Sequence, residues 1–307
     1  MSLRVTFLGT GGAVPTTERN VSGLVINREG DRLLFDAGEG TQRQMMRYGT
    51  GFTVSDVFVT HLHGDHILGL PGLLQTWDFN DREEAVTIHV PRGKESQIEQ
   101  LIEATETDPS YPVRVAGVEV GDVAIRADDY EVRAFDVEHR TRAVGYVLVE
   151  DDRKGRFDRE RAEELGVPVG PKFSKLHEGE AVELEDGTVV RPEQVVGSPR
   201  PGRRVVYTGD TRPVDSTVEV ARDADLLIHD GTFAEEWADR ARETGHSTAR
   251  EAARIASQAD VDRLALTHVS SRYAGDASPL AREAETAFGG EMMVAHDGLE
   301  IDVSYPE

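Results

Sequence analysis

The segment His61-Leu62-His63-Gly64-Asp65-His66 places three histidines and one aspartate within six positions. It directly follows the run Val57–Thr60, whose β-branched and aromatic residues predict a strand. Because alternate residues of an extended chain point to the same side, the first two histidines face one metal ion. The aspartate and the third histidine, beyond the flexible glycine, turn back onto a second ion. A single histidine is more often a packing or surface residue, but this density of ligands predicts a metal site.

Polar residues follow other apolar runs in the same way: His139 comes after Val132–Asp136, Asp210 after Val205–Tyr207, and His268 after Leu264–Leu266. Open sheets place ligand sites at the carboxyl ends of strands, because the loops converge there. We expect Asp210 to bridge two ions, since a carboxylate has two oxygens and a neutral imidazole has one free lone pair. The predicted ligand set is His61, His63, Asp65, His66, His139, Asp210 and His268. The chain has no cysteine, and this set suits two zinc ions, with manganese or ferrous iron as alternatives.

Segments with strand character alternate with segments of helical spacing along the chain. The helical spacing occurs in Gly40–Tyr48, Pro71–Trp77, Glu95–Thr105, Asp215–Arg222, Ser247–Ala259 and Pro279–Ala287. Strand-rich and helical segments interleaved in two halves predict an α/β fold in which two packed sheets carry helices on their outer faces.

The stretch Glu150–Gly179 interrupts this alternation. It is densely charged, then rich in Gly and Pro, and it has few apolar residues for its length. We interpret it as an excursion from the core, either a solvated linker or a protruding arm. Lys154, Lys172 and Lys175, three of the four lysines of the chain, lie in it.

The composition is strongly acidic, with 57 acidic residues against 34 basic ones and a formal net charge of −23. Outside the excursion the chain has a single lysine, Lys94, so the basic residues are nearly all arginine. Such a surface is typical of a protein that stays soluble in molar salt, where the Debye length is about 3 Å, and it predicts a halophilic host. An ordinary acidic protein would not explain the replacement of lysine by arginine. The sequence shows no apolar run of membrane-spanning length and no signal peptide, so we expect a cytoplasmic protein.

The ordered ligand pattern HxHxDH, His, Asp, His resembles the metallo-β-lactamase superfamily over essentially the whole chain. The resemblance implies a four-layer αββα sandwich over residues 1–307, with the metal ions at one edge of the paired sheets. Lactamases, glyoxalases, sulfatases and nucleases share this fold, so the ligand set by itself leaves the substrate open.

Further segments resemble the ribonuclease Z family of tRNA 3′-processing endonucleases. They are FLGTGGAVPTTERN, FDAGEGTQRQM, GPKFSKL, HDGTF, His246-Ser247-Thr248 and LTHVSSRYAGD. The resemblance implies removal of the 3′ trailer from precursor tRNA, leaving a 3′-hydroxyl on the tRNA. It also implies that residues 150–179 are a flexible arm that grips tRNA. Because the chain carries one copy of the ligand set, it implies the short form, which acts as a homodimer.

The resemblance also assigns catalytic roles. Asp65 orients or deprotonates the attacking water as well as binding metal, and His246 donates a proton to the departing 3′ oxygen. Asp230 is expected to orient His246. The residues expected to contact RNA are Arg19, Asn20, Lys154, Lys172, Lys175, Ser270 and Arg272. The first loop, Pro15–Asn20, departs from the family, because it carries Thr and Glu where many relatives have a lysine.

Three other functions compete with this interpretation. A hydrolase of small phosphodiesters such as cyclic nucleotides would use the same metals, but it would not need the GPKFSKL segment. A non-catalytic RNA-binding relative would not need Asp65 and His246. A β-CASP nuclease would have a large domain between its metal motifs, and this chain has none.

Overall fold

The computed structural model describes residues 2–105 and 109–306. The chain divides into two compact units. The first contains Met1–Val149 and Arg203–Ser304, and the second contains Glu150–Gly202 and Tyr305–Glu307. No helix among the described residues is long and apolar enough to cross a membrane.

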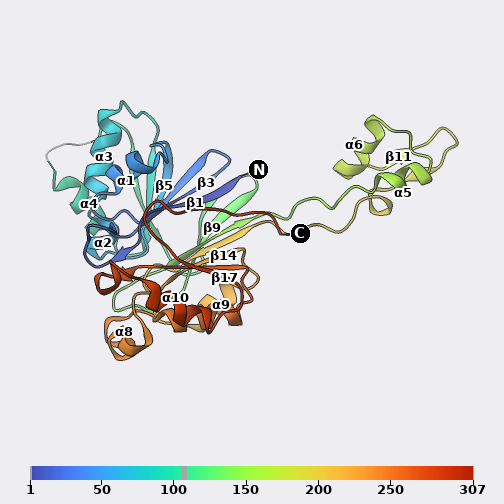
Figure 1. The fold of residues 1–307 in the computed structure, drawn as a ribbon. Coiled ribbons are helices and arrows are strands. Elements are labelled where there is room, and N and C mark those ends of the chain that lie inside the picture. The colour runs from blue at the N-terminus through green and yellow to red at the C-terminus, as the bar shows by residue number, and fades with distance from the viewer. Residues whose placement is uncertain (1, 106–108, 307) are drawn as a thin grey trace. The chain divides into compact units, whose positions relative to one another are not determined.

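Two seven-stranded sheets form the centre of the first unit (Figure 1). The first sheet has the order β18 (Glu300–Asp302), β1 (Leu3–Gly9), β3 (Gly23–Arg28), β4 (Asp31–Phe35), β5 (Val54–Phe58), β6 (Val86–Pro91) and β7 (Val113–Val118). Strands β18, β1, β3 and β4 pair antiparallel, and β4 to β7 pair parallel.

The second sheet has the order β17 (Glu291–Val294), β15 (Arg263–Thr267), β14 (Leu226–Asp230), β13 (Arg204–Tyr207), β10 (Gly145–Glu150), β9 (Tyr130–Phe135) and β8 (Val123–Arg126). Its strands β13, β14, β15 and β17 pair parallel, whereas β10 pairs antiparallel with β13. A short parallel pair joins β2 (Gly11–Gly12) to β16 (Val269–Ser270). This pair brings the first loop of the chain beside His268.

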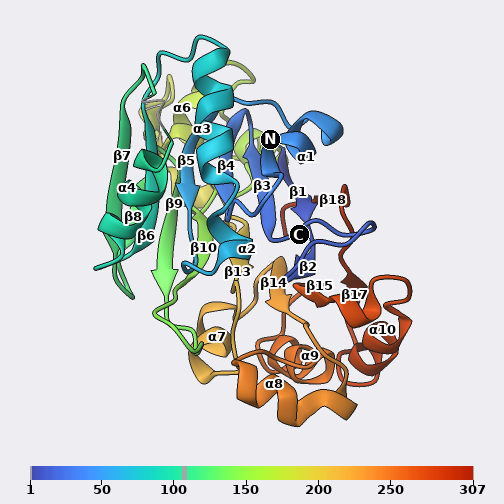
Figure 2. The same ribbon diagram turned by 90° about the vertical axis from the view of Figure 1, so that its left-hand side faces the viewer.

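Helices cover the outer face of each sheet. The helices of the first half are α1 (Thr41–Tyr48), α2 (Gly64–Ile67), α3 (Leu70–Phe79) and α4 (Glu95–Glu103). Those of the second half are α7 (Asp215–Val220), α8 (Ala238–Thr244), α9 (Ala249–Gln258) and α10 (Ser278–Glu285), with the 3-10 turns η2 (Glu235–Trp237) and η3 (Ser271–Tyr273). Figure 2 shows α8, α9 and α10 together beside the second sheet. The six predicted helices all occur, with ends shifted by a few residues, and α2 and α8 were not predicted.

The central strands of each sheet are buried on both faces, because one face packs on the other sheet and the opposite face packs on helices, whereas the edge strands β7, β8 and β17 are partly exposed. In β1, Leu3, Val5 and Phe7 point into the core between the two sheets, while Leu8 points to the helical side. Strand β14 repeats this alternation, with Leu226 and Ile228 between the sheets and Leu227 toward the helices. Three stacked cores therefore hold four layers together, which confirms the predicted αββα sandwich.

The second unit contains α5 (Arg159–Glu164), α6 (Pro171–Glu178), the hairpin of β11 (Val182–Glu183) and β12 (Val189–Val190), and the turn η1 (Pro192–Gln194). Asp158 caps α5 by accepting a hydrogen bond from the Arg161 amide. A small core fills its interior, made of Ala162, Val167, Leu176, Val182, Val190 and Val195. Because residues of the hairpin and η1 contribute to this core, the unit continues past Gly179, where the sequence had placed its end, to Gly202.

Candidate metal centre

The first four predicted ligands lie in one short segment at the carboxyl end of β5. His61 and His63 lie in the extended stretch after the strand, and His63 is the residue before the first turn of α2. Asp65 and His66 are within that turn. The extended stretch and the helical turn therefore direct the two pairs of side chains to different places.

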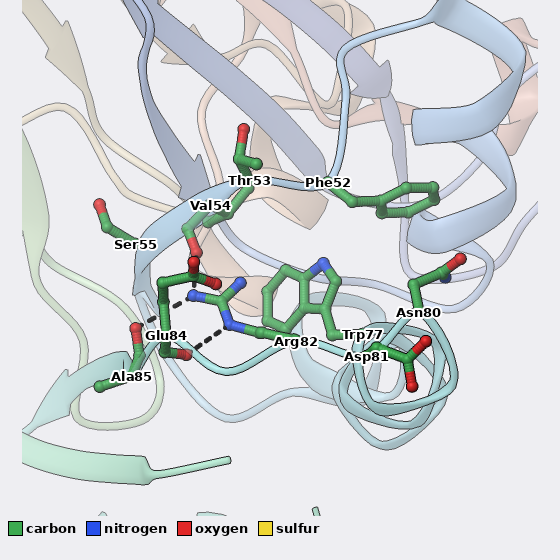
Figure 3. A pocket seen from close by; sticks show the side chains of 10 residues that line it. All are labelled: Phe52, Thr53, Val54, Ser55, Trp77, Asn80, Asp81, Arg82, Glu84 and Ala85. Carbon is green, nitrogen blue, oxygen red and sulfur yellow. Dashed lines mark hydrogen bonds between the residues drawn. The ribbon is translucent and has the colours of Figure 1, made fainter. Parts of the chain in front are cut away.

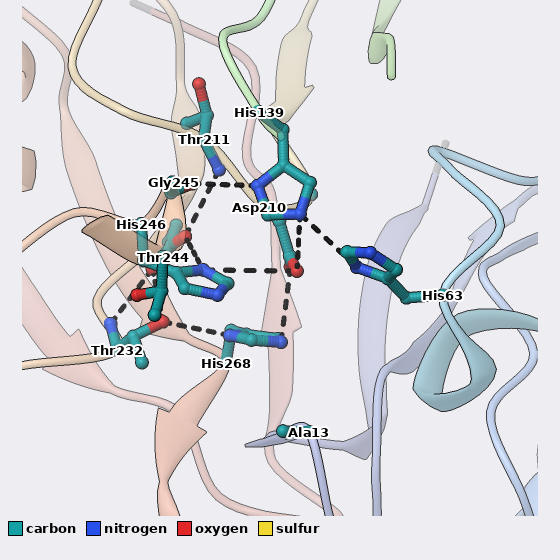
Figure 4. A network of polar contacts seen from close by, with 12 residues as sticks. Ala13, His63, His139, Asp210, Thr211, Thr232, Thr244, Gly245, His246 and His268 are labelled. Carbon is teal, nitrogen blue, oxygen red and sulfur yellow. Dashed lines mark hydrogen bonds and ion pairs between the residues drawn. The ribbon is translucent and has the colours of Figure 1, made fainter. Parts of the chain in front are cut away.

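His61, His63, His139 and Asp210 form one group of side chains that could hold a metal ion. Figure 4 shows His63, His139 and Asp210 of this group. The Nδ1 atom of His63 lies 2.9 Å from Nε2 of His61 and 3.3 Å from Nε2 of His139. Oδ2 of Asp210 lies 3.4 Å from Nε2 of His61 and 3.9 Å from Nε2 of His139. Three histidine nitrogens and one carboxylate oxygen thus face a common point.

Asp65, His66 and His268 form a second group next to the first. Oδ2 of Asp65 lies 3.2 Å from Nε2 of His268 and 3.6 Å from Nε2 of His66. Oδ1 of Asp210 lies 3.3 Å from both of these histidine nitrogens. The two oxygens of Asp210 therefore face different groups and connect them.

The spacing and chemistry of these atoms fit two metal ions. A tetrahedral ion with bonds of about 2.0–2.1 Å keeps neighbouring ligand atoms about 3.3 Å apart, which is close to the separations within both groups. Oδ1 of Asp210 is buried and has no hydrogen-bond partner among the described residues. A buried carboxylate oxygen without a donor is costly unless a cation compensates it. All seven predicted ligands are thus brought together, with His61 and His63 in one group and Asp65 and His66 in the other, as the sequence indicated, while the structure adds His139 to the first group and His268 to the second.

Each histidine except His63 is also held through its second ring nitrogen. The Nδ1 atoms of His61 and His268 contact threonine hydroxyls, Oγ1 of Thr60 at 3.1 Å and Oγ1 of Thr232 at 2.9 Å. Nδ1 of His66 contacts Oδ2 of Asp36 at 2.8 Å. Nδ1 of His139 contacts the carbonyl oxygen of Gly245 at 2.8 Å. Such contacts fix the ring orientation and the tautomer, and so they aim the other nitrogen at the metal position.

The backbone around His268 is tightly constrained. His268 has a φ of 59°, a left-handed conformation that is uncommon for a non-glycine residue. A Cβ atom at Gly12 would lie only 2.5 Å from the His268 ring, so only glycine fits at that position of β2. Gly12 therefore allows the first loop to approach the metal centre.

The charges of the second group reinforce one another. Burial acts most strongly on the pKa of His268 and lowers it, but Asp210, Asp65 and Asp230 together outweigh burial and raise the pKa to about 9. Burial likewise raises the pKa of Asp65, yet the hydrogen bond with His268 and the charge of His66 hold it well below its ordinary value. Protons thus lie between these carboxylates and imidazoles. A divalent cation can displace these protons and occupy the same positions.

His246 lies beside both groups but is held by a different carboxylate. Its Nδ1 atom lies 2.8 Å from Oδ2 of Asp230, compared with 3.9 Å from Oδ2 of Asp210. Asp230 is fully buried and also accepts hydrogen bonds from the amides of Thr211 and Thr232. The ring of His246 is therefore fixed by Asp230, and its Nε2 atom stays available.

Comparisons with known proteins agree with this geometry. The sequence model of the metallo-beta-lactamase superfamily matches residues 16–268. A protein of Natronomonas pharaonis named Ribonuclease Z is 69% identical over 307 residues, which cover 100% of both chains. This chain belongs to the ribonuclease Z family. A Ribonuclease Z of Haloferax volcanii is 68% identical, with 100% of this chain and 97% of the relative covered. The crystal structure of the short form of human tRNase Z superimposes with a TM-score of 0.71 at 28% identity, covering 98% of this chain and 99% of that one. The predicted family and fold are confirmed.

The residues predicted to contact RNA lie in varied surroundings in this ribonuclease Z chain. Arg19 is only 8% exposed, and its guanidinium donates to Thr10 and to the Ala295 carbonyl. Asn20 is also 8% exposed and donates from its side chain to the Glu39 carbonyl. Ser270 is buried, whereas Arg272 is exposed. The guanidinium of Arg19 thus supports the first loop from inside, and contact of all four residues with RNA stays a prediction.

The three lysines of the second unit also differ from one another. Lys154 and Lys175 are exposed. Lys172 is half-buried, and its ammonium donates to the Glu183 carbonyl at 2.6 Å. Contact of these lysines with RNA also stays a prediction.

Sequence reasoning missed the residues that hold the histidines. Asp36 is fully buried and accepts hydrogen bonds from Tyr207, at 2.8 Å, and from the amide and hydroxyl of Thr60. Asp36 has a φ of 55°, and its place in the FDAGEG segment, after β4, was the available signal. Thr232 had the same kind of signal from its place in the HDGTF segment. Thr60 and Gly245 gave none, because a threonine or glycine beside a ligand is common anywhere.

Two cavities of the first unit differ in their relation to the metal centre. The larger, of roughly 430 Å³, lies at the amino ends of β5 and β6, where Arg82 stacks over Trp77 at 4.8 Å (Figure 3). None of the predicted metal ligands lines this cavity, and the first four of them follow the opposite, carboxyl end of β5, so the cavity is separate from the metal centre. The smaller, of roughly 330 Å³, is bordered by Asn20, Gly40 and Gly69 and adjoins the first loop. Size alone would therefore have identified the wrong cavity as the active site.

Proposed function

We propose that this protein is a zinc-dependent endoribonuclease that removes the 3′ trailer from precursor tRNA and leaves a 3′-hydroxyl on the tRNA. The observation that carries the proposal is the pair of ligand groups joined by the two oxygens of Asp210, each within 3.4 Å of a histidine nitrogen of its group. Two metal sites that share one carboxylate suit hydrolysis of a phosphodiester. Membership in the ribonuclease Z family supports the choice of precursor tRNA.

Zinc is the metal that the donor set favours, because five imidazoles and two carboxylates present nitrogen and oxygen ligands and no thiolate. His61, His63 and His139 would hold one ion, Asp65, His66 and His268 the other, and Asp210 both. When bound, the pair of ions lowers the pKa of a water molecule and neutralises charge on the scissile phosphate. Manganese would fit the same ligands.

The protein's own residues then handle the protons. The carboxylate of Asp65 accepts the proton of the attacking water. Its Oδ2 atom is fixed by the Ala13 amide at 2.8 Å and by His268 at 3.2 Å. On the other side of the phosphate, His246 donates a proton from Nε2 to the leaving 3′ oxygen, while Asp230 stabilises the imidazolium through Nδ1. Ser270 and Arg272 are the proposed contacts to phosphate oxygens.

The second unit is the proposed tRNA-binding arm. Its separate core and its exposed cations, Lys154 and Lys175, support a module that binds the body of the substrate apart from the cut. The arm would serve the metal centre of a partner chain, in a homodimer. The acidic composition with few lysines supports work at high salt in a halophilic cytoplasm, where precursor tRNA is made.

The decisive experiment is to incubate the protein in concentrated potassium chloride, with zinc or manganese, with a precursor tRNA that carries a 3′ trailer. Sequencing the products should place the cut at the 3′ side of the tRNA body and show a 3′-hydroxyl there. Chelated protein is the matched control and should be inactive. Hydrolysis of a cyclic nucleotide or another small phosphodiester, without cleavage of precursor tRNA, would reject the proposal.

A further inference from the structure

We propose that Trp237 and Arg272 form a stacking platform for one unpaired base of the RNA, the base of the nucleotide that keeps the leaving 3′ oxygen. This inference rests on the proposed function and adds a positioning role for a tryptophan that no motif of the chain points to. It also gives Arg272 a role besides phosphate contact.

Trp237 is an exposed aromatic residue covered on one face by a cation. Its exposed fraction is 39%, whereas the other tryptophan of the chain, Trp77, is 1% exposed. The guanidinium carbon of Arg272 lies 4.7 Å from the centre of the Trp237 ring. A large apolar ring at the surface costs solubility, and pairing it with a planar guanidinium builds a flat surface for another planar group.

The platform is held rigidly by contacts between the loops that carry it. Trp237 ends η2, and Arg272 lies in the middle of η3. The hydroxyl of Tyr273 accepts a hydrogen bond from the Ala234 amide at 3.0 Å, and so it ties these two turns together. In addition, the Glu235 amide donates to Glu283 of α10 at 2.8 Å. A preorganised surface loses less entropy when a base binds than a flexible one would.

The ring of Phe233 connects the platform to the proposed proton donor, His246. The guanidinium of Arg272 also lies 6.0 Å from the Phe233 ring, and this ring lies 6.3 Å from the ring of His246. Phe233 pairs with Thr248 in a β-bridge, which fixes its loop to the His246–Thr248 segment. Arg272 follows the ligand His268 by one short turn. The platform therefore lies on the side where the 3′ oxygen departs, so the base it accepts belongs to the retained RNA.

The surroundings favour a base over a phosphate. The neighbours of Trp237 in η2 are Glu235 and Glu236, both exposed, and their charges repel a phosphate more than a neutral base. Unpaired RNA bases commonly stack on aromatic rings and arginine planes, and stacking accepts any base. Stacking also persists in molar salt, where binding through phosphates weakens. Stacking therefore lets a chain with a net charge of −23 bind RNA near the cleavage site without a basic surface.

The test pairs Trp237→Ala and Trp237→Phe with two precursor tRNAs, one intact and one abasic at the nucleotide 5′ to the cut. With the intact RNA we expect Trp237→Ala to lower single-turnover kcat/KM roughly 5- to 150-fold, and Trp237→Phe to restore most of the loss. With the abasic RNA the wild type should already be slow, and Trp237→Ala should lower the rate no further. This non-additivity identifies contact with that base.

Phe79→Ala is the matched control, because Phe79 is an exposed aromatic residue of the same unit, 86% exposed, at the far end of α3. It should leave both rates unchanged. Hydrolysis of bis(p-nitrophenyl) phosphate and the thermal midpoint should be equal in wild type and Trp237→Ala. If Trp237→Ala lowered kcat/KM equally on intact and abasic RNA, the proposal that Trp237 stacks on this base would be rejected. If wild type failed to cut precursor tRNA but cut the small diester, the proposed function would fail instead.

Discussion

The metal centre and the second unit differ in how strongly their functional side chains are buried and held in place by neighbouring residues. In the candidate metal centre, His61, His66 and Asp210 are each at most 2% exposed, and four of the five predicted histidine ligands are held by a second partner. In the second unit, Glu150–Gly202, a core of six small or aliphatic residues supports short helices, and its lysines are largely exposed. The comparison suggests that cutting depends on fixed geometry, whereas substrate binding depends on a separate surface that can change at little cost. The predictions below test this contrast, from the largest expected effect to the smallest.

Asp210→Ala should abolish activity on every phosphodiester, because one side chain supplies an oxygen to both ligand groups. Metal analysis of the purified variant should show loss of both ions. Asp302→Ala is a suitable control, since Asp302 pairs with Arg4 on the surface. Retention of two ions in Asp210→Ala would show that Asp210 does not connect the sites.

Asp65→Ala should slow cleavage of precursor tRNA and of a small diester alike, by about 10²–10⁴-fold, the usual loss for a general base. Metal content should fall only in part, because His66, His268 and Asp210 remain. Single-turnover rates and metal content measured on one preparation will test both statements. Cleavage within threefold of wild type would contradict the assigned role.

His246→Ala should slow cleavage within the lower part of the same range, about 10²-fold, and should keep both ions and RNA affinity. The physical reason is that Asp230, rather than an ion, holds Nδ1 of this ring. A substrate with a better leaving group, such as a nitrophenyl ester, should lose less, because its leaving oxygen needs no proton. A loss of metal in proportion to activity would make His246 a ligand.

Replacement of Asp151–Gly202 by Asn-Gly should preserve the metal centre and weaken cleavage of precursor tRNA only. Strands β10 and β13 pair antiparallel with Val149 opposite Arg204, so Glu150 and Arg203 can be joined by a two-residue hairpin turn. We expect hydrolysis of a small diester to stay within about twofold of wild type, while kcat/KM on precursor tRNA falls through KM. Equal losses on both substrates would make the unit part of the catalytic fold.

Lys154→Ala and Lys175→Ala should each weaken precursor-tRNA binding a few-fold at moderate salt, and the effect should fade as salt rises. Lys172→Ala should have a smaller effect, because its ammonium already donates to the Glu183 carbonyl. Lys94→Ala is the matched control, since it removes the one lysine outside the second unit. Dissociation constants from fluorescence anisotropy over a salt series provide the measurement. An equal change for Lys94→Ala would point to net charge alone.

Much of the first unit was predictable because its signals are local. The spacing of the HLHGDH segment predicted four ligands, and His139, Asp210 and His268 each follow an apolar strand at one sheet edge, which is where the structure brings all seven side chains together. The interleaving of strand-rich and helical segments predicted two packed sheets with helices on their outer faces. Those signals need only neighbouring residues, so one sequence was sufficient.

The remaining features depend on partners that are distant in sequence. Asp36 contacts His66, which follows a strand of the same sheet, and Tyr207, which lies in the second sheet. No local sequence pattern predicts contacts between residues so far apart in the chain. The burial of Arg19 follows from its bond to the Ala295 carbonyl, in a loop that looks like an exposed surface loop. The second unit extends to Gly202 because single residues such as Val190 and Val195 form its core, and such sparse apolar residues resemble those of a linker.

The hydrogen bond from the Ala13 amide to Asp65 affects which substitutions the first loop can accept during evolution. The donor is a main-chain amide, so it does not depend on a particular side chain at position 13, although the φ of 65° at Ala13 favours small residues or glycine there and proline would remove the donor. The following side chains, Val14 to Glu18, are mostly exposed. Natural selection can therefore change the side chains of this loop, for example replacing lysine by threonine or glutamate, while Asp65 keeps its hydrogen bond to the main chain. Side chains that tolerate substitution thus lie within a few residues of the main-chain amide that holds Asp65 in place.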